Sequence, residues 1–84
     1  MNIKVYNLSH NVTDSALNKI FSAYGVVDSA EVVRNKLNGR SRGNGHISMP
    51  VENEARQAIT SLDQTMLDGK RITVSELILP PQWD

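Results

Sequence analysis

The stretch Arg42-Gly43-Asn44-Gly45-His46-Ile47-Ser48-Met49 is typical of one strand of a sheet. Pro50 follows directly and ends the strand, because proline lacks the N–H that a sheet ladder needs. Asn38-Gly39, just before the stretch, is a strong turn signal, and the valine-rich segment 26–34 precedes that turn. The two segments are therefore predicted to pair as an antiparallel hairpin with a basic tip.

Apolar residues at helical spacing flank this hairpin on both sides. The first set predicts a helix over about residues 14–24, with Thr13 as its N-cap and Gly25 as its stop. The second set predicts a helix over about residues 52–62. The spacing residues are Leu17, Ile20, Phe21 and Tyr24 in the first helix, and Ala55, Ala58, Ile59 and Leu62 in the second.

Alternating residues at the two ends of the chain complete the set of strands. Ile3 and Val5 alternate with Lys4 and Tyr6 in the first strand. After the turn Asp68-Gly69, the last strand has inward Ile72 and Val74 between outward Arg71, Thr73 and Ser75. The order βαββαβ predicts an α+β fold, a ferredoxin-like sandwich with a four-stranded antiparallel sheet, two helices on one face and the other face open to a ligand.

Length and composition set the outer limits. A chain of 84 residues supports one domain, expected over residues 1–76, followed by an apolar tail over 77–84. The absence of cysteine excludes disulfides and thiolate metal sites, and no cofactor is indicated. The sequence shows neither a signal peptide nor a membrane span, so a cytoplasmic location is expected.

The charges balance overall but are unevenly placed. Lysine and arginine number 9, as do aspartate and glutamate, which argues against tight binding to any polyanion by bulk attraction alone. Arg34, Lys36, Arg40 and Arg42 nevertheless follow one another with no acid between them. This basic cluster is either a solvated loop or a guide for a phosphate backbone.

Two segments resemble the signature motifs of the RNA recognition motif family. Ile3-Lys4-Val5-Tyr6-Asn7-Leu8 is similar to the family's six-residue motif, and Arg42 to Met49 is similar to its eight-residue motif at the basic, both glycine and aliphatic positions. Segments 21–25 and 67–74 agree as well, so the resemblance runs from Asn2 to about Ser75. It implies that single-stranded RNA, with single-stranded DNA as a second candidate, binds on the open sheet face.

The resemblance fails at the positions that commonly stack on bases. Lys4, Asn44 and His46 stand where the family commonly has three aromatic rings. Each stacked base is worth about 1–3 kcal/mol, so binding is expected to be modest. Tyr6 points to the same face as Lys4 and either replaces one lost ring or only packs on the sheet. His46 either stacks more weakly than phenylalanine or is a solvated strand residue.

Other polar residues complete the expected site. Lys4, Arg42 and Arg71 are predicted to form a cationic outward surface for bases and phosphates. Asn44 and Ser75 are candidates for hydrogen bonds to base edges, and Arg34 and Arg40 for contacts to phosphate. Gly43 and Gly45 are predicted to face inward, where they let a helix approach the strand.

Two rival functions stay open at this point. The first is a protein-interaction module of the same fold, including a homodimeric one, which would use either the sheet or the tail residues Leu77, Leu79 and Trp83. The second is an enzyme of the same strand order, for which small acyl phosphatases are the precedent. Those enzymes need an arginine in the loop after the first strand, and residues 7–12 contain none, so no catalysis is expected.

Overall fold

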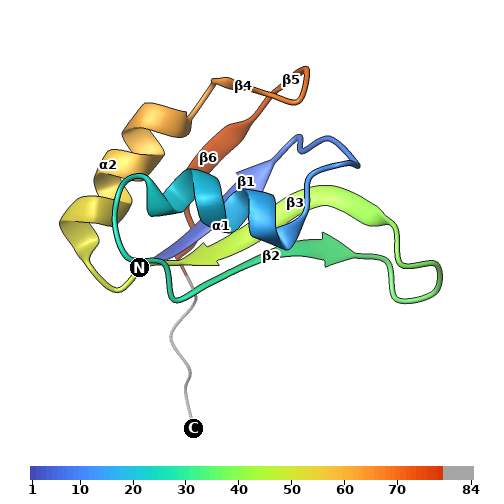
Figure 1. The fold of residues 1–84 in the computed structure, drawn as a ribbon, viewed down its shortest axis with the longest axis horizontal. Coiled ribbons are helices and arrows are strands. Elements are labelled where there is room, and N and C mark those ends of the chain that lie inside the picture. Colours follow the sequence, from blue (N-terminus) through green and yellow to red (C-terminus); the bar gives the residue numbers. More distant parts are fainter. Residues whose placement is uncertain (79–84) are drawn as a thin grey trace, which may run out of the picture.

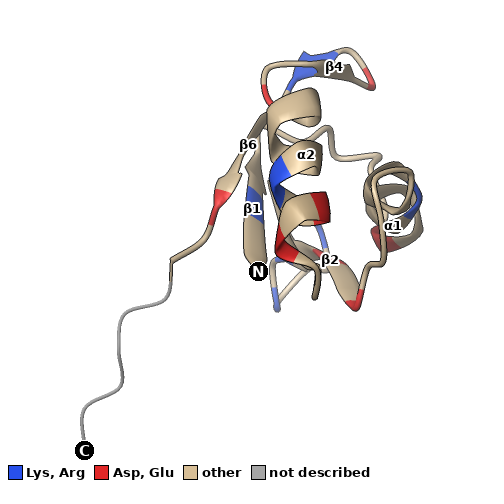
Figure 2. Cartoon of the chain, turned by 90° about the vertical axis from the view of Figure 1, so that its left-hand side faces the viewer, with Lys and Arg blue, Asp and Glu red and all other residues tan. Residues whose placement is uncertain are grey.

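Four strands form one antiparallel sheet in the order β2-β3-β1-β6, in a computed structural model that describes residues 1–78 (Figure 1). Both helices lie on the same side of β1 and β6, and among the described elements none lies on the other side (Figure 2). The predicted fold class is therefore confirmed. The sheet strands are β1 (Asn2–Tyr6), β2 (Ser29–Arg34), β3 (Ser41–Ser48) and β6 (Thr73–Glu76), and the helices are α1 (Asp14–Ser22) and α2 (Glu52–Leu62).

The helices begin and end close to where their signals lie. Thr13 caps α1, since its Oγ1 accepts a hydrogen bond from the Ala16 N–H at 3.2 Å. The helix ends at Ser22, two residues before the predicted end, and the Tyr24 N–H then donates to the Phe21 carbonyl at 3.0 Å. The bounds of α2 are those predicted from the sequence.

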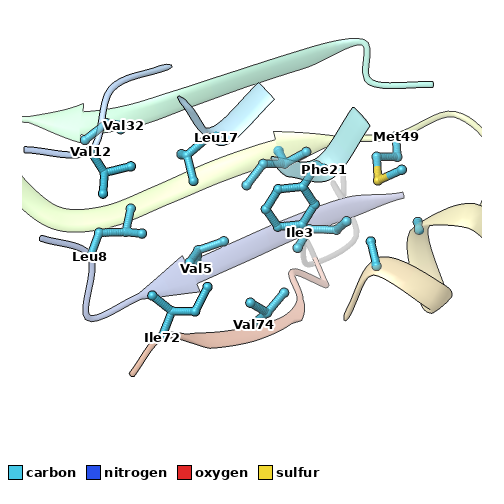
Figure 3. Packing of buried hydrophobic residues seen from close by; sticks show 13 residues of the cluster. Ile3, Val5, Leu8, Val12, Leu17, Phe21, Val32, Met49, Ile72 and Val74 are labelled. Carbon is cyan, nitrogen blue, oxygen red and sulfur yellow. The ribbon is translucent and has the colours of Figure 1, made fainter. Parts of the chain in front are cut away.

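The core lies between the sheet and the two helices (Figure 3). Ile3, Val5 and Ile47 project from the inner face of β1 and β3 and are completely buried. Leu17 and Phe21 of α1 are also completely buried. The alternation that predicted the strands thus exists because every second residue joins this apolar layer.

The two glycines of β3 have different roles. A Cβ on Gly45 would lie 2.7 Å from Leu17 Cδ1 and 3.2 Å from the Glu31 carbonyl oxygen, so the absence of a side chain lets α1 pack directly on the strand. Gly43 was expected to act in the same way, and that prediction is wrong. Its φ of +80° is one that residues with a Cβ rarely adopt, and it accompanies the register shift between Val32 and Arg34 in the β2–β3 pairing.

Two strand boundaries differ from the prediction. The second strand was expected from Val26, but β2 begins at Ser29, and Val26 is 58% exposed. The last strand was expected to include Arg71, but β6 begins at Thr73. Arg71 instead belongs to an additional hairpin of β4 (Met66–Leu67) and β5 (Lys70–Arg71). Asp68 and Gly69 join these strands with φ values of +52° and +83°, the signs of a type I′ turn.

Each outer strand of the sheet donates one backbone hydrogen bond to a carboxylate. In β2 the Val32 N–H donates to Asp14 Oδ1 of α1 at 2.7 Å. In β6 the Val74 N–H donates to Asp63 Oδ1, just after α2, at 2.9 Å. Both amides lie on strands that have a neighbour on one side only, so these carboxylates satisfy donors that the sheet leaves over.

The chain continues past β6 for a short described stretch. The Leu77 N–H donates to the Asn2 carbonyl at 2.8 Å, which prolongs the pairing with β1, and Ile78 is largely exposed. The boundary at residue 76 stays a prediction, and Leu79 and Trp83 of the expected tail lie outside the described residues. None of the described helices has the length and apolar character needed to cross a bilayer.

Candidate nucleic-acid interface

The open face of the sheet brings the predicted site residues of β1 and β3 together. Lys4 lies opposite His46 on one side and Ser75 of β6 on the other. Tyr6, in the next outward row, lies opposite Asn44 and Thr73. The three positions that lack the family's aromatic rings, together with Tyr6, therefore form one contiguous patch.

Tyr6 carries the larger and more exposed of the two aromatic rings of this patch, the other being the imidazole of His46. Tyr6 is 44% exposed, and the Lys4 Nζ lies 5.5 Å from the centroid of its ring. A cation at this distance from a ring is attracted by the electron-rich face, at exposed sites by about 0.5–1 kcal/mol. Since Tyr6 stands two residues beyond Lys4, its ring is displaced by about 7 Å along the strand from the position of the missing one.

His46 is flanked by a carboxylate that the sequence analysis did not consider. Glu31 of β2 lies opposite His46, and it faces outward because its neighbour Val32 is buried in the core. The ring is only partly exposed, and its Nε2 atom is buried without a hydrogen-bond partner among residues 1–78. His46 is thus a less open stacking surface than Tyr6.

A hollow of about 500 Å³ adjoins the Tyr6 ring and is called the sheet hollow below. Arg42 and Asn44 line it, as predicted for outward residues of this strand. Lys70 lines it as well, and was missed because the β4–β5 hairpin that carries it was not expected. The full lining consists of Tyr6, Asn7, Leu8, His10, Arg42, Gly43, Asn44 and Lys70.

The structure moves Arg71 away from its expected place. As a member of β5 it is outside the four-stranded sheet, so its predicted place in the last strand is wrong, while its predicted contact with RNA stays a prediction. Asn7 holds this segment against the end of β1, since its Nδ2 donates to the Arg71 carbonyl at 2.9 Å. The cation that this segment contributes to the sheet hollow is Lys70.

Arg34 and Arg40 lie at the base of the β2–β3 hairpin rather than on the sheet patch. Together with His10 and Ser41 they line a second hollow of about 390 Å³, called the hairpin hollow below. Arg34 pairs with Ser41 across the hairpin, and its Nη1 donates to the Gly39 carbonyl at 3.4 Å. His10, in the loop after β1, is common to both hollows.

The strand register separates the charges between the two ends of the sheet. Arg34, Arg42 and Lys70 lie at the end where β1 finishes and β3 starts. Asp28 and Glu76 lie at the opposite end, where the Asp28 N–H donates to the Ser48 carbonyl and Glu76 pairs with Ile3. The sheet hollow at this end has Arg42 and Lys70 in its lining and no carboxylate, which suits a polyanion. Within the described part of the chain, no three histidine or acidic residues group as metal ligands do.

Comparisons with known proteins decide the family. The model of the RNA recognition motif matches residues 3–73, which include both signature segments. This chain belongs to the RNA recognition motif family. The motif here has the family's strand order and glycine pattern, and it departs from the pattern at Lys4, Asn44 and His46.

Relatives of the motif are proteins named for RNA. Glycine-rich RNA-binding protein 1 of Mycosarcoma maydis is 43% identical over 77 residues, which are 89% of this chain and 44% of that protein. The chloroplastic 28 kDa ribonucleoprotein of Spinacia oleracea is 42% identical over 73 residues, 87% of this chain and 31% of that protein. The chain thus spans less than half the length of these curated relatives.

Solved structures of the motif superimpose closely. A crystal structure of RNA binding protein PG1 has a TM-score of 0.91 at 39% identity and covers 98% of this chain and 99% of its own. A Sex-lethal protein/RNA complex has a TM-score of 0.84 at 32% identity over 90% of this chain and 47% of its own.

Proposed function

We propose that this motif binds single-stranded RNA on its open sheet face, with Tyr6 as the base-stacking ring. The observation that carries the proposal is the contiguity of Tyr6 with Asn44, Arg42 and Lys70 around one hollow on a face that no described element covers. Family membership and the printed names of the relatives support RNA as the ligand.

Each residue has a role that follows from its chemistry. The Tyr6 ring stacks on one base, while the Arg42 guanidinium and the Lys70 ammonium meet the phosphates beside it. Asn44 and Ser75 carry groups that hydrogen-bond base edges. Lys4 is displaced from the Tyr6 ring by the incoming base and turns to a phosphate. With Tyr6 and the partly buried His46 imidazole in place of three open rings, affinity is modest.

The chain acts as a binding module rather than as an enzyme. The loop after β1 contains no arginine that could hold an acyl phosphate, and His10 in this loop is exposed to solvent. A protein-interaction role gains no specific support, because the exposed large apolar residues are spread over different segments of the described chain. They are Tyr6, Val26, Leu37, Val51, Met66 and Ile78. A cytoplasmic location stays a prediction.

Replacing the ring tests the proposal. Tyr6→Ala is expected to weaken binding of a labelled random single-stranded RNA pool by about 5- to 150-fold, equivalent to one lost stacked base. Tyr6→Phe is the matched control and keeps affinity within about twofold, since the ring remains. Fluorescence anisotropy at two salt concentrations measures both, and a DNA pool of the same length measures what the 2′-hydroxyls contribute.

Two results would overturn the proposal. The first is a protein that binds no RNA pool even at low salt. The second is a Tyr6→Ala variant that binds as tightly as the unmodified chain, which would place the RNA elsewhere.

A further inference from the structure

The hairpin hollow concentrates three groups that bind anions. His10, Arg34 and Arg40 line it together with Ser41, and no carboxylate takes part in the lining. These residues come from two separate segments, the loop after β1 and the base of the β2–β3 hairpin. Two guanidinium groups around one depression suit the oxygens of a phosphate, which arginine binds through paired hydrogen bonds.

Backbone hydrogen bonds fix the segments that carry these side chains. In the hairpin, the Asn35 N–H donates to the Arg40 carbonyl at 2.8 Å, and the Gly39 N–H donates to the Asn35 carbonyl at 2.8 Å. The Arg40 N–H donates in addition to Asn38 Oδ1 at 2.9 Å. The loop after β1 is tied to β3, since the Leu8 N–H donates to the Gly43 carbonyl at 2.8 Å. The backbone of the hollow is therefore ordered before any ligand arrives.

The charges of the hollow are not neutralised within the protein. Among residues 1–78 the one ion pair joins Arg56 to Glu52 at 2.6 Å, on the exposed side of α2. Arg34 makes its hydrogen bond to a neutral carbonyl, so its positive charge stays uncompensated. An anion that enters the hollow thus gains attraction without displacing an internal carboxylate.

The hairpin hollow and the sheet hollow are neighbours. His10 contributes to the lining of both. A strand stacked on Tyr6 and held by Arg42 passes His10 before it reaches Arg34 and Arg40. Arg34 and Arg40 belong to the β2–β3 hairpin, so such a strand would extend from the sheet toward this hairpin.

We propose that His10, Arg34 and Arg40 form a phosphate subsite for the nucleotides that extend past the sheet, so that the chain reads bases on the sheet and gains affinity from RNA length in the hairpin hollow. This inference rests on the proposed RNA binding at Tyr6. His10 lines both hollows and contacts the backbone between the stacked base and the arginines.

A comparison of RNA lengths tests the subsite. Anisotropy is measured with random single-stranded RNA pools of about four and about ten nucleotides, because the sheet of such a motif holds two or three bases. The double variant Arg34→Gln/Arg40→Gln is expected to lose on the order of tenfold in affinity for the longer pool and less than about twofold for the short one. For this variant, the slope of log affinity against log salt concentration becomes shallower by roughly 0.7 for each lost phosphate contact.

The control removes the same charge elsewhere. Lys19→Glu lowers the net charge by two, as the arginine double variant does, at an exposed position of α1 that does not line the hairpin hollow. It is expected to retain the gain in affinity with length. His10→Ala is a second test, because it removes the imidazole and leaves both arginines in place. This variant is expected to lose part of the gain in affinity with RNA length. A variant that unfolds at the same temperature as the unmodified chain is correctly folded, so its loss of affinity is not due to misfolding.

The outcomes separate the two proposals. If the unmodified chain binds neither pool, RNA binding itself fails, and the subsite fails with it. If the unmodified chain binds both pools and the arginine double variant keeps the full gain with length, the subsite alone is wrong. If the lysine control loses the same gain, the effect is bulk charge, and the subsite is equally wrong.

Discussion

The two faces of the sheet have the same strands but obey different constraints. On the inner face Ile3, Val5 and Ile47 are completely buried, and Gly45 has no room for a methyl group. On the open face Lys4, His46 and Asn44 stand where the family commonly has aromatic rings, and the fold is unchanged. The comparison teaches that the inner face determines the fold, whereas the open face is free to vary with the ligand.

Neighbouring positions of β3 provide the sharpest test of this difference, because Gly45 and Asn44 face opposite sides. Gly45→Val is expected to destabilise the domain by about 3 kcal/mol, since its Cβ would lie 2.7 Å from Leu17 Cδ1 and 3.2 Å from Leu8 Cδ1. Asn44→Val is the matched control and changes the free energy of unfolding by less than about 0.5 kcal/mol. Urea unfolding measures both, and equal stability of the two variants would contradict the difference between the faces.

Restoring an aromatic ring addresses the open face alone. Asn44→Phe places a ring beside Tyr6, its partner across the strands, and is expected to tighten RNA binding by about 2 kcal/mol, or roughly 30-fold. Thr60→Phe adds the same ring to the exposed side of α2 and leaves affinity unchanged. Anisotropy with one RNA pool compares the two, and no gain for Asn44→Phe would mean that bases do not stack at this row.

The smallest expected effect concerns the carboxylate of the open face. Glu31→Gln removes a negative charge opposite His46 and is expected to raise affinity by less than about 1 kcal/mol at low salt, since exposed charges act weakly and are screened. Glu52→Gln makes the same change in net charge on α2 and serves as the control. A gain that persists at high salt, or that is equal in both variants, would show that position on the sheet does not matter.

Most of the fold could be predicted because its signals are local. The signals depend only on neighbours in the sequence. They are the spacing of apolar residues, every second in strands and every third or fourth in helices, the Thr13 cap and the turn at Asn38-Gly39. The start of β2 was misplaced because Val26 and Val27 have the composition of a strand, whereas pairing with β3 is what decides. The bulge at Gly43 was missed because the sequence does not show whether a strand glycine is required for close packing or for a positive φ.

The site was harder to predict because it joins segments far apart in the chain. Alternation placed Lys4, Tyr6, Asn44 and His46 on one face, and the register agrees. Lys70 and His10 come from loops, whose positions no periodicity specifies. Glu31 alternates with Val32, so its outward direction follows from the sequence, but its place opposite His46 depends on the strand register, which the sequence does not show.

The carboxylates that bind Val32 and Val74 have a consequence for how crowded chains behave. Each outer strand of the sheet is a template on which another strand could assemble, and stacked copies of such a sheet are the beginning of a fibril. Asp14 and Asp63 occupy one donor on each template, and both bring a negative charge to that edge. A second chain that pairs with either outer strand must first displace this acceptor and approach its negative charge.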